Sequence, residues 1–95
     1  MISYDAAIIG GGIIGASAAL ELARHKLRIV LLDRAQPGRE ASWAAAGMLS
    51  PAPDAPDAVP LVPLARASLD LYPGFIAAIE SATARATNYR TYGAL

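Results

Sequence analysis

The chain has 95 residues, 55% of them hydrophobic, with eight basic and eight acidic residues and no net formal charge. This hydrophobic content excludes a disordered tail, and charges scattered singly leave no basic stripe for nucleic acid. The absence of cysteine excludes a disulfide framework, a zinc site and a thiolate nucleophile within these residues, so no metal is predicted.

The first apolar stretch, residues 6–20, is uncharged, but it is not typical of a signal peptide or a membrane span. Asp5 precedes it where a signal peptide carries a basic residue, and glycines interrupt it. It is also shorter than the ~20 residues that a spanning helix needs. We therefore expect a cytoplasmic protein without a membrane span.

Two strands and a helix are predicted in the first third of the chain. Residues 5–9 form an apolar run without alternation, typical of a parallel strand covered on both faces. A glycine-rich turn over 10–15 opens a helix over 13–25, and a second strand follows over 28–33. This order predicts a parallel pair of strands with a right-handed crossover.

Three glycines of the turn each have a separate task. Gly10 lets the chain turn sharply out of the strand, Gly12 lacks a Cβ that would block a pyrophosphate, and Gly15 lets the helix pack closely. The N–H groups near Ile13 and Ile14 then face the phosphates at the positive end of the helix dipole. The pattern predicts a dinucleotide site, and the alternative is a glycine-rich turn in an ordinary apolar protein.

Asp33 ends the second strand, where its carboxylate can accept hydrogen bonds from ribose hydroxyls. Arg34 has several interpretations: it lies over the adenine, contacts a phosphate, takes the 2′-phosphate of NADP, or is simply solvated. The negative charge of Asp33 argues against NADP, because it would repel that phosphate.

A loop with a proline–glycine turn is expected over 34–40, followed by a short alanine-rich helix. Ser42 is the expected N-cap of that helix, and Gly47 is expected to end it. Together with Ala46 and Met48, these residues can bring a hydroxyl and backbone N–H groups to the cofactor. The alternative is a buried alanine helix.

The second half of the chain is expected to be a proline-rich loop followed by helices. Prolines between 51 and 63 oppose regular structure over most of that interval, and a helical pattern begins near Leu61. Pro73 and Gly74 should kink or break this helix, and residues 91–95 read as an interrupted strand. We therefore expect an incomplete α/β domain: the N-terminal βαβ portion of a Rossmann-like fold, then the loop and helices.

Several segments resemble the N-terminus of the glycine oxidases, the thiamine-biosynthesis members of the D-amino-acid oxidase family of FAD enzymes. The matching segments are GGGIIG at 10–15, DR at 33–34, REAS at 39–42, WAAAGMLSP at 43–51, LDLYP at 69–73 and NYRT at 88–91. The glycine motif is shared by many flavin and nicotinamide proteins, whereas the alanine–glycine–methionine segment is much more specific.

The resemblance implies a set of FAD contacts. They are Ile13 and Ile14 at the pyrophosphate, Asp33 and Arg34 at the adenosine, Ala41 and Ser42, and Ala46, Gly47 and Met48 near the flavin. It implies oxidative deamination of glycine, other small amines or D-amino acids with dioxygen as acceptor. The products would be an imine or 2-oxo acid, ammonia and hydrogen peroxide.

The same resemblance places the residues that grip the substrate downstream of this chain. We therefore assign no catalytic residue, and we expect residues 1–95 to be the N-terminal part of the FAD-binding domain, inactive alone and without the substrate domain. The expected partner is a small amine or amino acid bound by that further domain. The sequence leaves the oligomeric state of the full-length protein open, and a homo-oligomer is one of the alternatives.

Two residues depart from the family pattern, and two other functions stay open. Lys26 stands where the family has glycine after the first helix, and a positive φ there would cost about 1 kcal/mol. Asp33 replaces the more frequent glutamate. The first 33 residues would serve an NAD(P)-dependent dehydrogenase equally well, and the chain could instead work alone as a small binding module.

Overall fold

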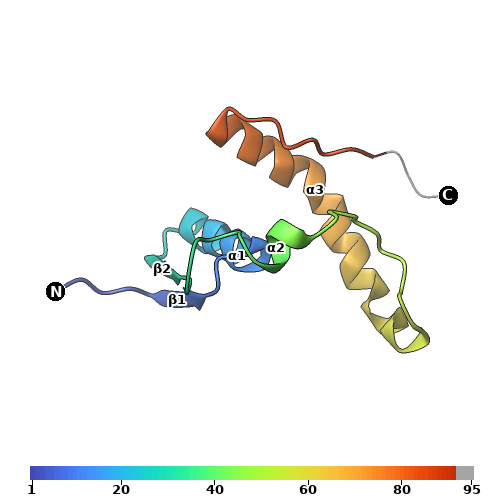
Figure 1. The fold of residues 1–95 in the computed structure, drawn as a ribbon, viewed down its shortest axis with the longest axis horizontal. Coiled ribbons are helices and arrows are strands. Elements are labelled where there is room, and N and C mark those ends of the chain that lie inside the picture. The colour runs from blue at the N-terminus through green and yellow to red at the C-terminus, as the bar shows by residue number, and fades with distance from the viewer. Residues whose placement is uncertain (92–95) are drawn as a thin grey trace. The chain divides into compact units, whose positions relative to one another are not determined.

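The structure, a computed structural model, describes residues 1–91, and Figure 1 shows its elements in chain order. The chain divides into two compact units, Met1–Gly47 and Met48–Leu95. The first contains β1 (Ala6–Ile9), α1 (Ile13–Arg24), β2 (Ile29–Leu32) and α2 (Ala41–Ala44). The second contains the 3-10 helix η1 (Pro56–Leu61) and α3 (Val62–Thr83). Most of the strand expected over 91–95 lies outside the described residues.

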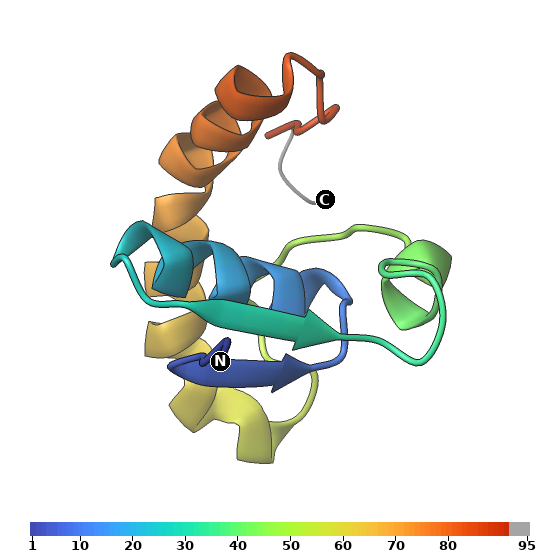
Figure 2. The same cartoon turned by 90° about the vertical axis from the view of Figure 1, so that its left-hand side faces the viewer.

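In the first unit, β1 and β2 form a parallel pair, with Ala6 opposite Ile29 and Ile9 opposite Leu32. Figure 2 shows the two arrows pointing the same way, with α1 packed along them. The predicted βαβ arrangement is confirmed. Within Met1–Gly47 only α1 covers the strands, so the expected cover on both faces is not found, and no apolar side chain among residues 1–91 is fully buried.

Backbone pairing extends beyond both ends of the strands. The N–H of Asp5 donates to the carbonyl of Arg28 at 2.8 Å, and the Arg28 N–H donates to Asp5 Oδ2 at 2.8 Å. At the other end, the Gly10 N–H donates to the carbonyl of Leu32 at 2.7 Å. These bonds bring the glycine turn and the end of β2 to the same edge of the sheet.

The C-terminal end of α1 is closed by Lys26, which has a left-handed conformation with φ 64°. Its N–H donates to the carbonyl of Ala23 at 2.9 Å, and the Leu27 N–H donates to the carbonyl of Leu22 at 3.2 Å. This pair of bonds is the Schellman motif, which glycine usually closes. The positive φ predicted for Lys26 is confirmed, at a cost of about 1 kcal/mol relative to glycine.

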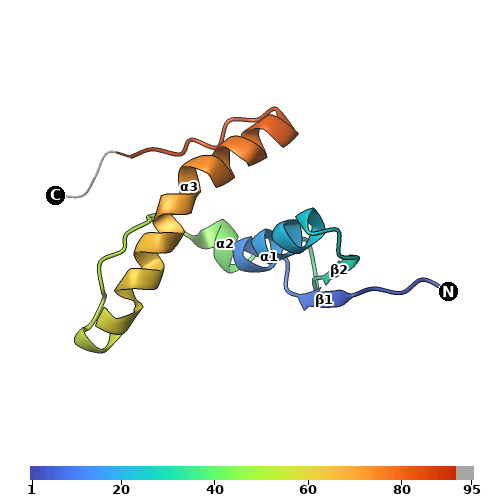
Figure 3. The same ribbon diagram turned by 180° about the vertical axis from the view of Figure 1, so that it is seen from behind.

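In the second unit, α3 runs from Val62 through Pro73 to Thr83 without interruption, so of the two outcomes expected at Pro73 and Gly74, a kink or a break, the break is not found. The helix bends along its length instead, as Figures 1 and 3 show. A proline removes one intrahelical hydrogen bond, and the helical residues on both sides absorb that loss by bending.

The start of α3 agrees with the sequence, because Leu61 is its N-cap. The proline-rich segment is more regular than expected, since η1 begins at Pro56. Proline fits the first position of a helix, where its missing N–H would have no partner. No helix within residues 1–91 has the length and apolar character needed to cross a bilayer.

Candidate functional site

The glycine turn lies where β1 ends and α1 begins. Gly10 has φ 105°, a conformation that favours glycine. A Cβ on Gly15 would collide with the carbonyl oxygen of Gly10 and would lie 3.1 Å from its carbonyl carbon and 3.3 Å from Ile8 Cγ2. The predicted close approach of α1 to β1 at Gly15 is therefore present in the structure.

The start of α1 is held by a hydroxyl from a distant part of the chain. Ser42 Oγ accepts a hydrogen bond from the Ile13 N–H at 2.8 Å, and a Cβ on Gly12 would lie 3.0 Å from this oxygen. The expectation that Ser42 is the N-cap of α2 is wrong, because Glu40 occupies that position. The hydroxyl instead satisfies an unpaired N–H of α1, as an N-cap side chain does.

Other N–H groups of the first turn of α1 stay available. Within residues 1–91, neither the Ile14 N–H nor the Gly15 N–H has an acceptor. Ile13 and Ile14 are 58% and 84% exposed, so the first turn of α1 is open to solvent in this structure. A helix start with free N–H groups at the positive end of its dipole is a site for anions.

A cavity of about 430 Å³ adjoins these groups. Its lining residues are Ile8, Ile9, Gly10, Gly12, Ile13, Ile14, Gly15, Ala18 and Ser42. The glycines and isoleucines predicted to contact a dinucleotide therefore line the same cavity.

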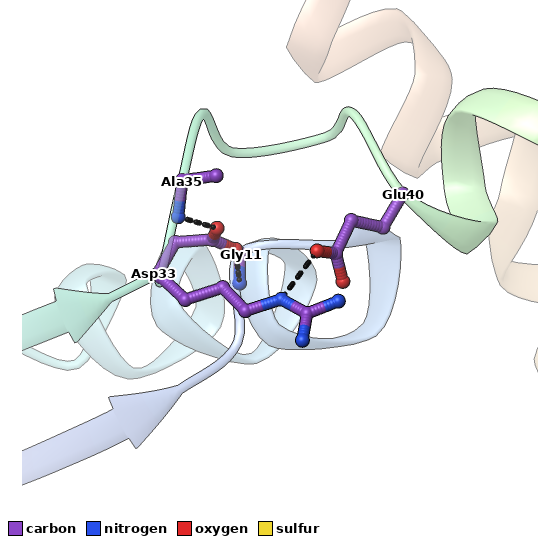
Figure 4. Close-up of polar contacts among 5 residues, drawn as sticks. Gly11, Asp33, Ala35 and Glu40 are labelled. Carbon is purple, nitrogen blue, oxygen red and sulfur yellow. Dashed lines mark hydrogen bonds and ion pairs between the residues drawn. The ribbon is translucent and has the colours of Figure 1, made fainter.

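Asp33 lies just beyond β2 and holds the glycine turn. Its Oδ2 accepts from the Gly11 N–H at 2.8 Å and its Oδ1 from the Ala35 N–H at 2.9 Å, as Figure 4 shows. The N–H groups of Ala35 and Gly11 lower the pKa of Asp33 below its usual value. Each carboxylate oxygen keeps a further lone pair, so a ribose hydroxyl could still donate to it.

Gly11 is a functional position that the sequence reasoning missed. It is buried, and a Cβ there would lie 2.9 Å from Pro37 Cβ and 3.0 Å from Leu31 Cδ2. The signal was present as the middle glycine of the GGG run, but its contacts come from residues twenty or more positions away.

Arg34 forms an ion pair that the sequence did not predict. Its Nε donates to Glu40 Oε1 at 2.6 Å, across the loop between β2 and α2. A second cavity of about 160 Å³ lies on this side of the glycine turn. It is lined by Gly10, Gly11, Gly12, Asp33, Gly38, Glu40, Ala41 and Ser42.

The alanine–glycine–methionine segment lies outside these cavities. The helix α2 ends at Ala44 with an extended Ala45, so the expected helix end at Gly47 is wrong. In the described structure neither cavity is lined by Ala46 or Gly47, and Gly47 has φ 77°. Met48 begins the second unit and is 87% exposed.

The residues present fit the pyrophosphate and ribose of a dinucleotide. Gly10 and Gly12 add no side chain of their own at the approach to α1, the Ile14 and Gly15 N–H groups lack acceptors, and Asp33 lines the second cavity. No group of metal-ligating side chains occurs among residues 1–91. The free N–H groups at the start of α1 can themselves hold a diphosphate.

Comparison with known proteins agrees with this chemistry. A family profile described as FAD dependent oxidoreductase matches residues 5–95. The glycine oxidase of Geobacillus kaustophilus is 41% identical over 80 residues, covering 84% of this chain and 21% of the relative. The D-amino acid dehydrogenase of Methylobacterium sp. strain 4-46 is 46% identical over 59 residues, covering 60% of this chain and 14% of the relative. The bifunctional protein ThiO/ThiG of Synechocystis sp. is 38% identical over 93 residues, covering 96% and 14%.

The chain spans about a fifth, or less, of the length of these curated relatives. No solved structure gives a significant match to it. Because the family profile covers nearly the whole chain, and the glycine turn and Asp33 are placed as a dinucleotide requires, the chain belongs to the FAD dependent oxidoreductase family.

Proposed function

We propose that the protein carrying this chain is an FAD-dependent amine oxidase of the glycine oxidase type, and that residues 1–95 belong to its FAD-binding domain. The observation that carries the proposal is the pair of free N–H groups at Ile14 and Gly15, which share a cavity with Ser42, next to a glycine turn that Asp33 holds through the Gly11 N–H. The proposed substrate is glycine, another small amine or a D-amino acid, and the context is thiamine biosynthesis.

Bound FAD would supply the redox chemistry, taking two electrons from the amine and passing them to dioxygen to give hydrogen peroxide. The residues of this chain would bind and orient it. The Ile14 and Gly15 N–H groups would hold the pyrophosphate, and the Ser42 hydroxyl, which accepts from Ile13, keeps its own hydrogen to donate. Asp33 would accept from the ribose.

The full proposed FAD-binding set also includes residues that the two cavities do not settle. It comprises Gly10, Gly12, Ile13, Ile14, Gly15, Asp33, Arg34, Ala41, Ser42, Ala46, Gly47 and Met48. Ala46, Gly47 and Met48 rest on the family resemblance alone and are proposed to lie toward the flavin.

Family membership favours FAD over a nicotinamide cofactor, which the first 33 residues alone could not do. A stand-alone binding module would need its own core, and no apolar side chain of residues 1–91 is fully buried. Oxidase activity is favoured by the glycine oxidase relatives, although a D-amino acid dehydrogenase also matches. The electron acceptor is therefore the point that needs measurement.

The test uses the complete protein. We expect a yellow preparation with a flavin spectrum that releases hydrogen peroxide when glycine or a small amine is added in air. Gly12→Val should abolish FAD uptake, because a side chain there meets Ser42 Oγ within 3.0 Å at its first carbon. Gly74→Val is the matched control, since nothing lies within 4 Å of a Cβ at that position.

Three results would contradict the proposal. A colourless protein that binds NAD and takes up no FAD would refute the cofactor assignment. A Gly12→Val variant with unchanged flavin affinity would refute the binding site. A flavin spectrum that bleaches with substrate but recovers only with an artificial dye, and not with dioxygen, would refute the oxidase assignment.

A further inference from the structure

We propose that Arg34 and Glu40 form a positioning clamp for the cofactor site: their ion pair closes loop 34–40 and keeps the Ser42 hydroxyl at the start of α1. The inference rests on the proposed function, because the site it organises is the proposed FAD site. Arg34 lines neither cavity and enters the proposed FAD-binding set through the family resemblance; the inference gives it a positioning role in place of direct contact with adenosine.

The loop is anchored at both ends near the glycine turn. At its beginning, the Asp33 carboxylate binds the Gly11 and Ala35 N–H groups, and just past its end Ser42 binds the Ile13 N–H. Figure 4 shows Asp33 and Glu40 at opposite ends of the loop. Within the described residues, the Arg34–Glu40 bond of 2.6 Å is the one side-chain contact that joins the two ends directly.

The clamp reaches Ser42 through α2. Glu40 is the N-cap of this helix, and its carbonyl accepts the Ala44 N–H at 3.1 Å. A helix of one turn has little stability of its own, so its position depends on the contacts that tether it. Releasing Glu40 from Arg34 therefore removes one of the contacts that position the short helix carrying Ser42, beside the Ser42–Ile13 hydrogen bond and the stacking of Arg39 on Trp43.

The size of the effect follows from exposure. The Arg34 side chain is 82% exposed and the Glu40 side chain 52%, so water and salt screen the pair. An exposed ion pair of this kind corresponds to a change of about two- to fivefold in an equilibrium constant. The expected effect on FAD affinity is thus modest and needs a design that separates it from direct contact.

The affinity experiment titrates the apoprotein of the complete protein with FAD. Arg34→Gln and Glu40→Gln should each weaken binding about two- to fivefold, and the double variant should be no weaker than either single variant. The charge-exchanged variant, Arg34→Glu with Glu40→Arg, should recover most of the affinity. Arg24→Gln is the matched control, because Arg24 forms an exposed ion pair with Glu21 on α1, away from the loop.

Direct contact between Arg34 and FAD makes the opposite prediction for Glu40. Removing a carboxylate that competes for Arg34 would leave the affinity unchanged or raise it, whereas Arg34→Gln would lower it. That combination, or a charge exchange that fails to recover affinity, would overturn the clamp.

A second measurement needs no cofactor. Hydrogen exchange of the apoprotein should show faster exchange in the segment containing Ile13 for Arg34→Gln, Glu40→Gln and Ser42→Ala, and wild-type exchange for Arg24→Gln. Unchanged exchange in Glu40→Gln would refute the clamp. Failure of the wild-type protein to bind FAD would refute the proposed function instead, and the exchange result would still decide the clamp.

Discussion

Alanine has no room at position 15 of this structure, whereas alanine at position 74 meets open space. Both glycines lie inside helices, Gly15 in α1 and Gly74 in α3. The same substitution therefore tests packing at one site and intrinsic helix preference at the other.

The expected changes in unfolding free energy follow from the atoms that surround each position. At position 15 the added methyl collides with the Gly10 carbonyl and lies 3.3 Å from Ile8 Cγ2, so α1 must move away from β1. Overpacking of this kind costs up to about 3 kcal/mol, and the better helix propensity of alanine returns about 1 kcal/mol. We expect a net loss of about 2 kcal/mol for Gly15→Ala and a gain of up to about 1 kcal/mol for Gly74→Ala.

Thermal unfolding and FAD titration of the complete protein measure both effects. Gly15→Ala should lower Tm and weaken FAD binding at least about tenfold, because moving α1 displaces the free Ile14 and Gly15 N–H groups. Gly74→Ala should keep the wild-type affinity and a Tm at or above that of the wild type. If Gly15→Ala keeps the wild-type Tm and FAD affinity, α1 need not approach β1 closely. If Gly15→Ala and Gly74→Ala lower Tm and affinity equally, packing at position 15 is not the cause of those losses.

Three further substitutions test the contacts around the turn. Asp33→Asn should weaken FAD binding at neutral pH. In the wild type the folded pKa of Asp33 lies below its unfolded value of about 3.8, so the stabilisation by this carboxylate is complete above pH 3.8 and is lost as pH falls through the lowered pKa. An equal difference in unfolding free energy between variant and wild type at pH 7 and at the lowest pH reached would contradict this. Ser42→Ala removes the acceptor of the Ile13 N–H and should cost about 1 kcal/mol in unfolding free energy, measured by urea titration, and no change would show that water replaces the hydroxyl. Lys26→Gly should raise stability by about 1 kcal/mol in the same titration because φ is 64° there, and a lower stability would show that the lysine side chain stabilises the helix end.

The βαβ unit could be predicted because its signals are local. Apolar runs without alternation give the two strands, and the glycine turn precedes a helical pattern that ends one residue from the predicted limit. The left-handed Lys26 was also predictable, because it stands where the family has glycine after the helix, and helices commonly end with one residue in that conformation. At Pro73 the sequence left a kink and a break open, and α3 continues with a bend (Figure 1), because one proline removes only one intrahelical hydrogen bond.

The contacts of Ser42 with Ile13 and of Asp33 with Gly11 could not be predicted, because each joins positions far apart in the chain. Nothing in the neighbourhood of Ser42 shows that its hydroxyl serves the first N–H of α1 rather than its own helix. The bond between Asp33 and the Gly11 N–H likewise depends on where the end of β2 meets the glycine turn, whereas the bond to the Ala35 N–H is local. Sequence periodicity locates elements, whereas the partner of a polar side chain depends on how those elements fold back on one another.

The difference between local signals and long-range contacts also explains what the site residues contact in the structure. Gly12 and Asp33 were chosen for a ligand, yet in this structure their neighbours are protein atoms: Ser42 Oγ at Gly12, and the Gly11 and Ala35 N–H groups at Asp33. The cradle is therefore preformed by the chain itself, which lowers the ordering cost of binding a diphosphate. A preformed cradle also means that a substitution in loop 34–40 can change cofactor affinity without touching the cofactor, and that affinity alone cannot assign a contact. A contact is assigned by variants that distinguish an effect on the loop from an effect on ligand contact, such as the exchange of charges between Arg34 and Glu40.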